Sequence, residues 1–465
     1  MTSLTSRREP AVPDIGVPRG AALYVGALLG PGLLLLPGLA VTRAGPASIL
    51  AWAGLLVVSG LFAIVFAALG VRYPSAGGVR AYAEAGLGPR VGRAVAWCFL
   101  AGVVTGAPIV CVTCGNYVAD LLGGDLRLAS ASAAVLLLGT LAVALRGVRT
   151  SATVQFGLVL LLVVIVVGAV TGAAPASSAA NWTPFAPHGW LAIGPAAATL
   201  MLAFVGWEAI APLTHRFARP RQQLPVVIGI AFGTTTVIYL ALGTVTVAAL
   251  GPQASTSVPL AALLTLAVGP AGRTIAAVGA GVLTVGAVLA YLSGAASLAR
   301  SLTSGARIGP TSARLGSVGS RLGSVGSRLG NVARRPAVAS DVMPPWLLAA
   351  LLGSGVVLIG LLGTGRVGLA ALVNVPTTFF LVVYLGCTAA ACRVLPGPLR
   401  VVAAVALVAV VAMLVFSGYA LVPAACVTAF ALLARRGRAA RGDRVASRVP
   451  VGGAGMRRSD TGPHV

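Results

Sequence analysis

Runs of about twenty apolar residues recur along the whole chain and are separated by short polar segments. A helix of this length and composition is what crosses the hydrocarbon core of a bilayer. The pattern therefore predicts an all-α membrane protein with twelve transmembrane helices. The runs lie at about 20–41, 47–69, 94–118, 128–145, 151–170, from 191 onward, and at about 224–250, 273–302, 346–362, 367–395, 398–416 and 420–433.

Two of these runs contain residues that disfavour a continuous helix. The first holds Gly30-Pro31-Gly32, and the sixth holds Gly206 before Trp207 and Glu208. Because proline removes a backbone donor and glycine loosens the turn, we expect both helices to be broken. Broken helices five spans apart are typical of an inverted repeat that binds its substrate near the membrane midplane. Their free amides favour anions and their free carbonyls favour cations, which suits a zwitterion.

Glu208 is the only carboxylate inside the long apolar runs. An ionised carboxylate at the bilayer centre costs about 2.5–3.5 kcal/mol on insertion scales, so such residues usually face a cavity, a partner or a proton path. Glu208 is therefore the first functional candidate. The alternative is a glutamate that reaches interfacial water or is satisfied by a neighbouring helix.

Composition and charge support a membrane protein. Hydrophobic residues make up 58% of the chain and charged residues 9%, whereas a soluble domain carries about 25% charged residues. The net charge of +24 could suggest a nucleic-acid partner. The arginines, however, lie between the apolar runs and form no continuous basic face, so the lipid bilayer is the expected partner and nucleic acid is not.

The arginines also predict an orientation. All 33 basic residues are arginine, and a cytoplasmic N-terminus with twelve spans places all but four of them on the inner side. Both termini are then cytoplasmic, and the composition suggests the inner (plasma) membrane of a bacterium. The four exceptions are Arg43, Arg127, Arg273 and Arg366.

The expected organisation is one transmembrane domain with polar ends. Residues 1–18 form a cytosolic tail, 19–434 the transporter domain, and 435–465 a disordered basic tail. Within the domain we expect repeat one at about 19–173, repeat two at about 191–396 and extra helices at about 398–434. A basic cytosolic linker at 305–345 carries the repeated heptapeptide Arg-Leu-Gly-Ser-Val-Gly-Ser, and its glycines favour a flexible segment over a coiled coil.

Several short motifs, in this order, resemble the amino acid–polyamine–organocation superfamily of permeases. The similarity covers nearly the whole apolar chain and is greatest to the bacterial methionine and branched-chain amino acid exporters. The motifs are Gly26 to Gly32 with Pro37, Tyr73-Pro-Ser-Ala-Gly-Gly78 with Tyr82, Gly106-Ala-Pro108, Gly147-Val-Arg149 with Gln155, and Phe204-Val-Gly206-Trp207-Glu208 with Pro220 and Pro225.

The resemblance implies a role for each part of the two breaks. The substrate carboxylate would bind the backbone around Leu29, Gly30, Pro31 and Gly32, although Pro31 departs from the family pattern because it lacks an N–H. The ammonium group would lie near the carbonyls from Phe204 to Gly206. Trp207 would be an aromatic wall or gate, and Glu208 the proton-linked switch.

These features predict a secondary transporter of neutral amino acids, of the methionine or branched-chain type, that exports by proton-coupled alternating access. An importer or exchanger of another amino acid or an amine is one alternative, and a non-transporting membrane sensor or scaffold is another. Sodium coupling stays open, since Ser293 and Ser297 share a helix face, but helix packing explains them equally well.

No enzymatic chemistry is indicated. The sequence contains no phosphate-binding glycine loop, no Ser/His/Asp cluster and no metal-ligand cluster, so we expect neither a cofactor nor an enzyme. Cys111 and Cys114 have redox spacing, but they lie in the middle of an apolar run without a second Cys/His pair. We interpret them as packing thiols. The oligomeric state is not indicated.

Overall fold

The computed structural model describes residues 15–75, 77–146, 152–209, 211–303 and 343–433. The expected tails and the heptapeptide linker fall largely or wholly outside these residues. So does the Gly147-Val-Arg149 motif.

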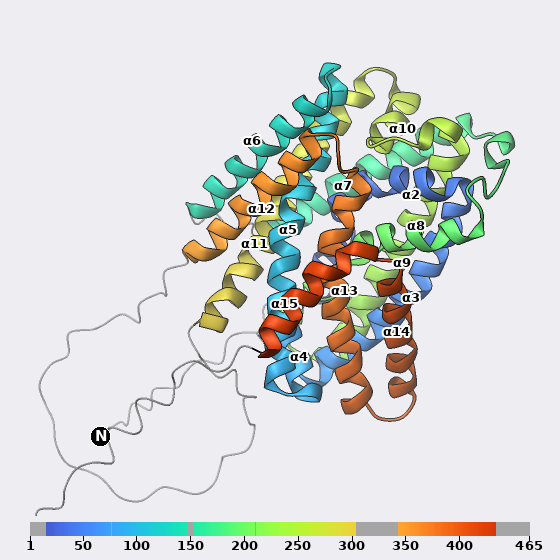
Figure 1. Cartoon of the computed structure of the whole chain (residues 1–465). Coiled ribbons are helices and arrows are strands. Elements are labelled where there is room, and N and C mark those ends of the chain that lie inside the picture. Colours follow the sequence, from blue (N-terminus) through green and yellow to red (C-terminus); the bar gives the residue numbers. More distant parts are fainter. Residues whose placement is uncertain (1–14, 76, 147–151, 210, 304–342, 434–465) are drawn as a thin grey trace, which may run out of the picture.

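The described part of the chain folds into helices joined by turns and short loops, and it contains no named strand (Figure 1). The α-helices are α1 Val17–Leu28, α2 Leu36–Ala44, α3 Ser48–Arg72, α4 Gly78–Leu87, α5 Pro89–Leu122, α6 Leu126–Leu145, α7 Ala152–Ala173, α8 Ile193–Leu200, α9 Pro220–Leu250, α10 Pro259–Val268, α11 Ala271–Thr303, α12 Pro345–Gly363, α13 Leu369–Val394, α14 Pro398–Val415 and α15 Leu421–Leu433.

Short 3₁₀ helices extend or connect these elements. They are η1 Pro31–Leu34, η2 Gly45–Ala47, η3 Ala174–Ala176, η4 Ala179–Trp182, η5 Trp190–Ala192, η6 Met201–Phe204, η7 Ala211–Arg216, η8 Gly251–Ala254 and η9 Gly418–Ala420. Two of them, η1 and η6, lie where the sequence predicts broken helices.

Nine helical segments among the described residues are long and apolar enough to cross a membrane, fewer than the twelve expected. The difference has a local cause. The first expected span is divided into α1, with 12 residues, and α2, with 9, while α8 of the sixth has only 8. The last expected span, α15, has 13. The nine segments are Leu36–Arg72, Pro89–Leu122, Leu126–Leu145, Val154–Ala176, Pro220–Ala254, Ala271–Arg300, Pro345–Gly363, Leu369–Val394 and Pro398–Val415.

Helix α5 occupies the middle of the bundle, where it packs against α6, α11, α12, α13 and α15 (Figure 1). In its most apolar stretch 67% of the residues are buried, compared with 17% in α14. α5 is therefore a core helix, whereas α14 lies at the periphery of the bundle. Small residues allow the close packing, since a Cβ on Gly115 would lie 3.1 Å from the Ala129 carbonyl carbon.

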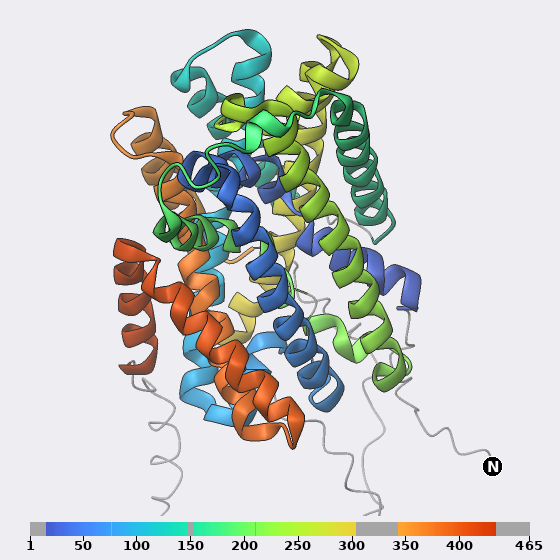
Figure 2. The same ribbon diagram turned by 90° about the vertical axis from the view of Figure 1, so that its right-hand side faces the viewer.

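Helices α3 and α9 run side by side on another face of the bundle (Figure 2). α9 also packs against α1, so it connects the first interrupted segment to the rest of the fold. Helix α10 was not expected from the sequence, because its ten residues are too few for a span. It packs between α7 and α11.

Candidate functional site

The first interruption follows from Pro31. Helix α1 ends at Leu28, and the Leu29 N–H still bonds to the Val25 carbonyl at 2.7 Å. Pro31 has no N–H to continue the ladder, and the residue before a proline is restricted to extended conformations. Gly30 is extended accordingly, with φ −72° and ψ −177°, and η1 begins at Pro31.

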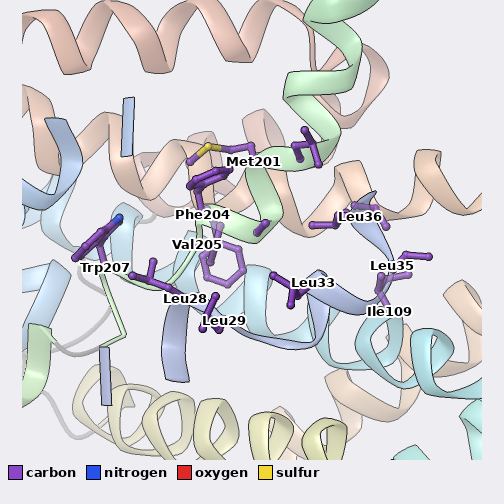
Figure 3. Packing of buried hydrophobic residues seen from close by; sticks show 14 of the residues in the cluster. Leu28, Leu29, Leu33, Leu35, Leu36, Ile109, Met201, Phe204, Val205 and Trp207 are labelled. Carbon is purple, nitrogen blue, oxygen red and sulfur yellow. The ribbon is translucent and has the colours of Figure 1, made fainter. Parts of the chain in front are cut away.

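The second interruption is centred on Gly206. The chain leaves η6 through an extended Val205, and Gly206 has a φ of 157°. A Cβ on Gly206 would lie 2.8 Å from the carbonyl carbon and oxygen of Ala27, so only glycine permits this contact. The two interruptions thus meet backbone to backbone, and Figure 3 shows Leu28 and Leu29 beside Val205 and Phe204.

A cavity of about 80 Å³ lies where the interruptions meet α5, α11 and α13. It is large enough for several water molecules, and Tyr291 is the one lining residue with a polar side-chain group. Such a surface suits an apolar ligand side chain. The lining consists of Ala27, Leu28, Gly30, Gly32, Gly102, Val103, Gly106, Ala107, Val110, Leu202, Ala203, Val205, Ala287, Val288, Tyr291 and Phe380.

The predicted residues of the first break reach this cavity in part. Gly30 and Gly32 line it, while Leu29 lines a smaller adjoining cavity together with Gly30 and Gln155. Pro31 begins η1 between them. Among the backbone hydrogen bonds of the described residues outside helices, none uses the N–H of Gly30 or Gly32 as donor. Both residues line the cavity, and neither N–H is used by those bonds.

The sixth segment contributes different residues from those expected. Leu202, Ala203 and Val205 line the cavity, whereas Phe204, Gly206 and Trp207 do not. Val205 follows η6 in an extended conformation, and the backbone changes direction between this lining residue and Trp207.

Trp207 is a buried packing residue in this conformation. Its Nε1 donates to the Ser59 hydroxyl at 3.0 Å, and its ring centroid lies 5.8 Å from that of Tyr24. Phe204 is likewise enclosed, with ring centroids of Trp52 and Tyr239 at 5.9 and 5.1 Å. The aromatic wall expected at Trp207 thus does not border the cavity.

Glu208 is 1% exposed and belongs to the protein interior. Its Oε2 accepts hydrogen bonds from the Gly206 N–H at 3.0 Å and from the Tyr384 hydroxyl at 2.7 Å. Its Oε1 is buried and has no hydrogen-bond donor among the described residues. The ion pairs found there, Arg80 with Glu84 and Arg273 with Asp120, do not include it. Burial without a cationic partner costs a carboxyl group less free energy in its protonated form than in its ionised form. The group can therefore take up a proton.

Three buried tyrosines bind carbonyls at the interruptions. Tyr239 of α9 donates toward both the Leu28 carbonyl at 2.5 Å and the Ala203 carbonyl at 2.6 Å. Tyr117 of α5 bonds to the Leu34 carbonyl at 2.6 Å, and Tyr384 also approaches the Phe204 carbonyl at 3.3 Å. These residues were not predicted. Tyrosines in the middle of apolar runs were the available signal, because a buried hydroxyl usually finds a partner.

The residues considered for sodium coupling lie away from the cavity. Ser293 and Ser297 are exposed on α11, and the Ser293 hydroxyl bonds to the Ala290 carbonyl of its own helix at 2.8 Å. Their exposure does not fit the expectation that they pack one helix against another. Cys111 and Cys114 are free thiols buried in α5.

A multi-pass helical bundle with two interrupted helices beside a cavity is an architecture that membrane transporters use. Sequence similarity identifies the family. The family model described as amino acid permease matches residues 15–431, so the chain belongs to the amino acid permease family.

Similar proteins are named as permeases, exporters or transporters. The L-methionine/branched-chain amino acid exporter YjeH of Escherichia coli is 28% identical over 84% of this chain and 88% of its own length. The uncharacterized amino acid permease YecA of Bacillus subtilis is 30% identical over 48% of this chain. That match spans about half of YecA, at 52% of its length. The methylthioribose transporter of Bacillus subtilis is 26% identical over 43% of this chain and 47% of its own length.

Proposed function

We propose that this permease is a secondary transporter of neutral amino acids with apolar side chains, methionine or the branched-chain residues, and that it exports them by proton-coupled alternating access. The observation that carries the proposal is the meeting of two interrupted helices at an apolar cavity. The named activity of YjeH, which matches most of the chain, supports the substrate class.

The proposed topology has twelve crossings, with α1–η1–α2 as the first and α8–η6–η7 as the sixth. Two inverted five-span repeats, about 19–173 and 191–396, would be followed by α14 and α15 as extra helices. Both termini would lie on the cytoplasmic side of a bacterial plasma membrane. The position of the interruptions in corresponding spans supports this arrangement.

Each part of a zwitterionic substrate has a candidate partner at the cavity. The carboxylate would accept from the unused N–H groups of Gly30 and Gly32 at the start of η1. The ammonium group would bind carbonyls at the ends of α1 and η6. The side chain would then lie among Val103, Gly106 and Phe380, where each buried CH₂ contributes about 0.8 kcal/mol.

Glu208 would take up and release the coupling proton. Its Oε2 is bonded to the Gly206 amide of the second interruption and to Tyr384 of α13. A change of its charge would alter both contacts, and rearrangement of these two elements would change which side the cavity faces.

A second candidate is an importer or exchanger of another amino acid or an amine. The relatives include a methylthioribose transporter and the branched-chain amino acid permease BcaP of Bacillus subtilis. Methylthioribose and methionine share a methylthio group, and an apolar cavity would accept that group from either molecule. The direction of net flux depends on the gradients as well as on the protein.

Counterflow in proteoliposomes tests the proposal. Vesicles are loaded with unlabelled methionine or leucine, and uptake of the labelled amino acid is followed for the wild type and Glu208→Gln. We expect saturable exchange by the wild type, and loss of net pH-driven flux in the variant with exchange retained. Folded wild-type protein that exchanges no neutral amino acid would refute the proposed substrate class. Equal pH-driven flux by Glu208→Gln would refute its coupling role.

A further inference from the structure

The hydroxyl of Tyr239 lies between two carbonyl oxygens that end the two interrupted helical segments. It is 2.5 Å from the Leu28 oxygen and 2.6 Å from the Ala203 oxygen. A phenol has one proton, so it can donate to only one of them at a time. The other carbonyl oxygen then lies within hydrogen-bond distance of the hydroxyl oxygen but receives no proton from it.

Neither carbonyl has an obvious backbone donor to replace the hydroxyl. The residues three and four positions after Leu28 are Pro31, which has no N–H, and Gly32, whose N–H makes no bond outside helices among the described residues. The residue three positions after Ala203 is Gly206, and its N–H donates to Glu208. The interruptions thus leave two acceptors at the negative ends of their helical segments.

Leu28 and Ala203 line the cavity, whereas Tyr239 does not. The tyrosine is fully buried behind them, with its ring 5.0 Å from that of Trp52. Leu28 and Ala203 therefore border the cavity while their carbonyl oxygens contact the Tyr239 hydroxyl. A ligand group with several donors and a positive charge would match them better than one hydroxyl does.

We propose that Tyr239 sets the affinity of the permease for the ammonium group of its substrate by competing for these two carbonyls. This inference rests on the proposed function and adds a residue to it. In the empty protein the hydroxyl partly satisfies both acceptors, and an ammonium group, with three donors, replaces it on at least one.

The same contact stabilises the empty carrier. Net export requires the empty protein to return to its inward-facing state, whereas exchange does not. Without the hydroxyl, both carbonyls would lose this donor during that return. Removal of the hydroxyl should therefore slow net efflux relative to exchange, in addition to tightening binding.

The test measures binding of labelled leucine to full-length protein in nanodiscs, in buffer with sodium replaced by N-methylglucamine. Tyr239→Phe is expected to bind leucine about three- to tenfold more tightly, because the substrate no longer displaces a hydrogen bond. The inhibition constant of 4-methylpentanoate, which is leucine without its amino group, should be the same in the variant and the wild type. Net efflux from proteoliposomes should fall more than leucine exchange.

A matched control is Tyr117→Phe. Tyr117 is equally buried and donates to a carbonyl of the same interrupted span, Leu34, at 2.6 Å, but Leu34 does not line the cavity. Its leucine affinity should stay at the wild-type value. A second variant carries 3,5-difluorotyrosine in place of Tyr239, which keeps the shape and donates a stronger hydrogen bond. Leucine affinity should fall in that protein.

The outcomes separate this inference from the proposed function. Unchanged or weaker leucine binding by folded Tyr239→Phe would overturn the inference and leave the transport proposal intact. Unchanged or tighter binding by the difluorotyrosine protein would do the same, even if the phenylalanine variant fails to fold. Wild-type protein that binds no neutral amino acid would overturn both.

Discussion

Tyr384 and Glu208 are joined by a hydrogen bond of 2.7 Å between the tyrosine hydroxyl and Oε2 of the carboxyl group, although 176 residues separate them in the chain. The bond connects α13 to the second interruption, and both side chains are buried. It is a direct contact between Glu208 and α13. The rings of Phe62 and Phe66 enclose Tyr384, with centroids at 4.6 and 5.3 Å.

Tyr384→Phe removes this bond and leaves the Oε2 atom with the Gly206 amide alone. A buried acceptor that loses a partner costs about 1–3 kcal/mol, so we expect a lower midpoint of thermal unfolding in detergent. Exchange should fall as well, because the carboxyl group is no longer fixed relative to α13. Tyr419→Phe is a suitable control, since Tyr419 is 63% exposed. Wild-type stability and exchange in Tyr384→Phe would contradict a coupling role for the bond.

Gly206→Ala should abolish folding or transport. Its Cβ would lie 2.8 Å from the Ala27 carbonyl group, which is backbone and cannot rotate away. Gly365 provides the matched control, because its φ of 69° also favours glycine but a Cβ there meets nothing within 4 Å. Gly365→Ala should cost only about 1 kcal/mol. Surface expression and exchange measure both variants, and a functional Gly206→Ala would show that the interruptions can separate without loss.

Local composition was enough to predict the two interruptions. Pro31 and Gly206 act on their own backbone, so their effect is visible in the sequence around them. Glu208 could also be identified from the sequence as a functional candidate, because a charged residue in an apolar run is unusual at any depth. The family followed from the order of several such motifs, and the family match confirms it.

The partners across the bundle could not be predicted in the same way. Tyr239 and Leu28 are 211 residues apart, and nothing in either neighbourhood indicates the other. The cavity could not be predicted for the same reason, since α5, α11 and α13 contribute to it from distant parts of the chain. Val205 lines the cavity and Phe204 and Trp207 do not, and this depends on the direction of the backbone after η6. Helix α10 was missed because a ten-residue apolar segment gives no clear period or span length.

The Trp207 and Ser59 pair should be energetically coupled. Ser59→Ala leaves a buried indole N–H without its acceptor, which is expected to lower the free energy of unfolding by about 1–3 kcal/mol. Trp207→Phe removes the donor, so Ser59→Ala should have a smaller effect in that background. Thermal unfolding of both single variants and the double variant measures the coupling. Additive effects would show that the hydrogen bond contributes little to holding Trp207 away from the cavity.

The size of the apolar cavity should determine which substrates are carried, and Gly106 is the position at which to change it. Gly106 lines the cavity on α5, and its nearest atom to an added Cβ is the Pro376 Cβ at 3.5 Å, an ordinary contact. Gly106→Ala should therefore fold normally and occupy part of the space. We expect exchange of methionine and leucine to fall severalfold relative to exchange of alanine.

Gly139→Ala on α6 controls for the added methyl group, because a Cβ there meets nothing within 4 Å and Gly139 does not line the cavity. Equal selectivity in Gly106→Ala and the wild type would place the substrate side chain elsewhere.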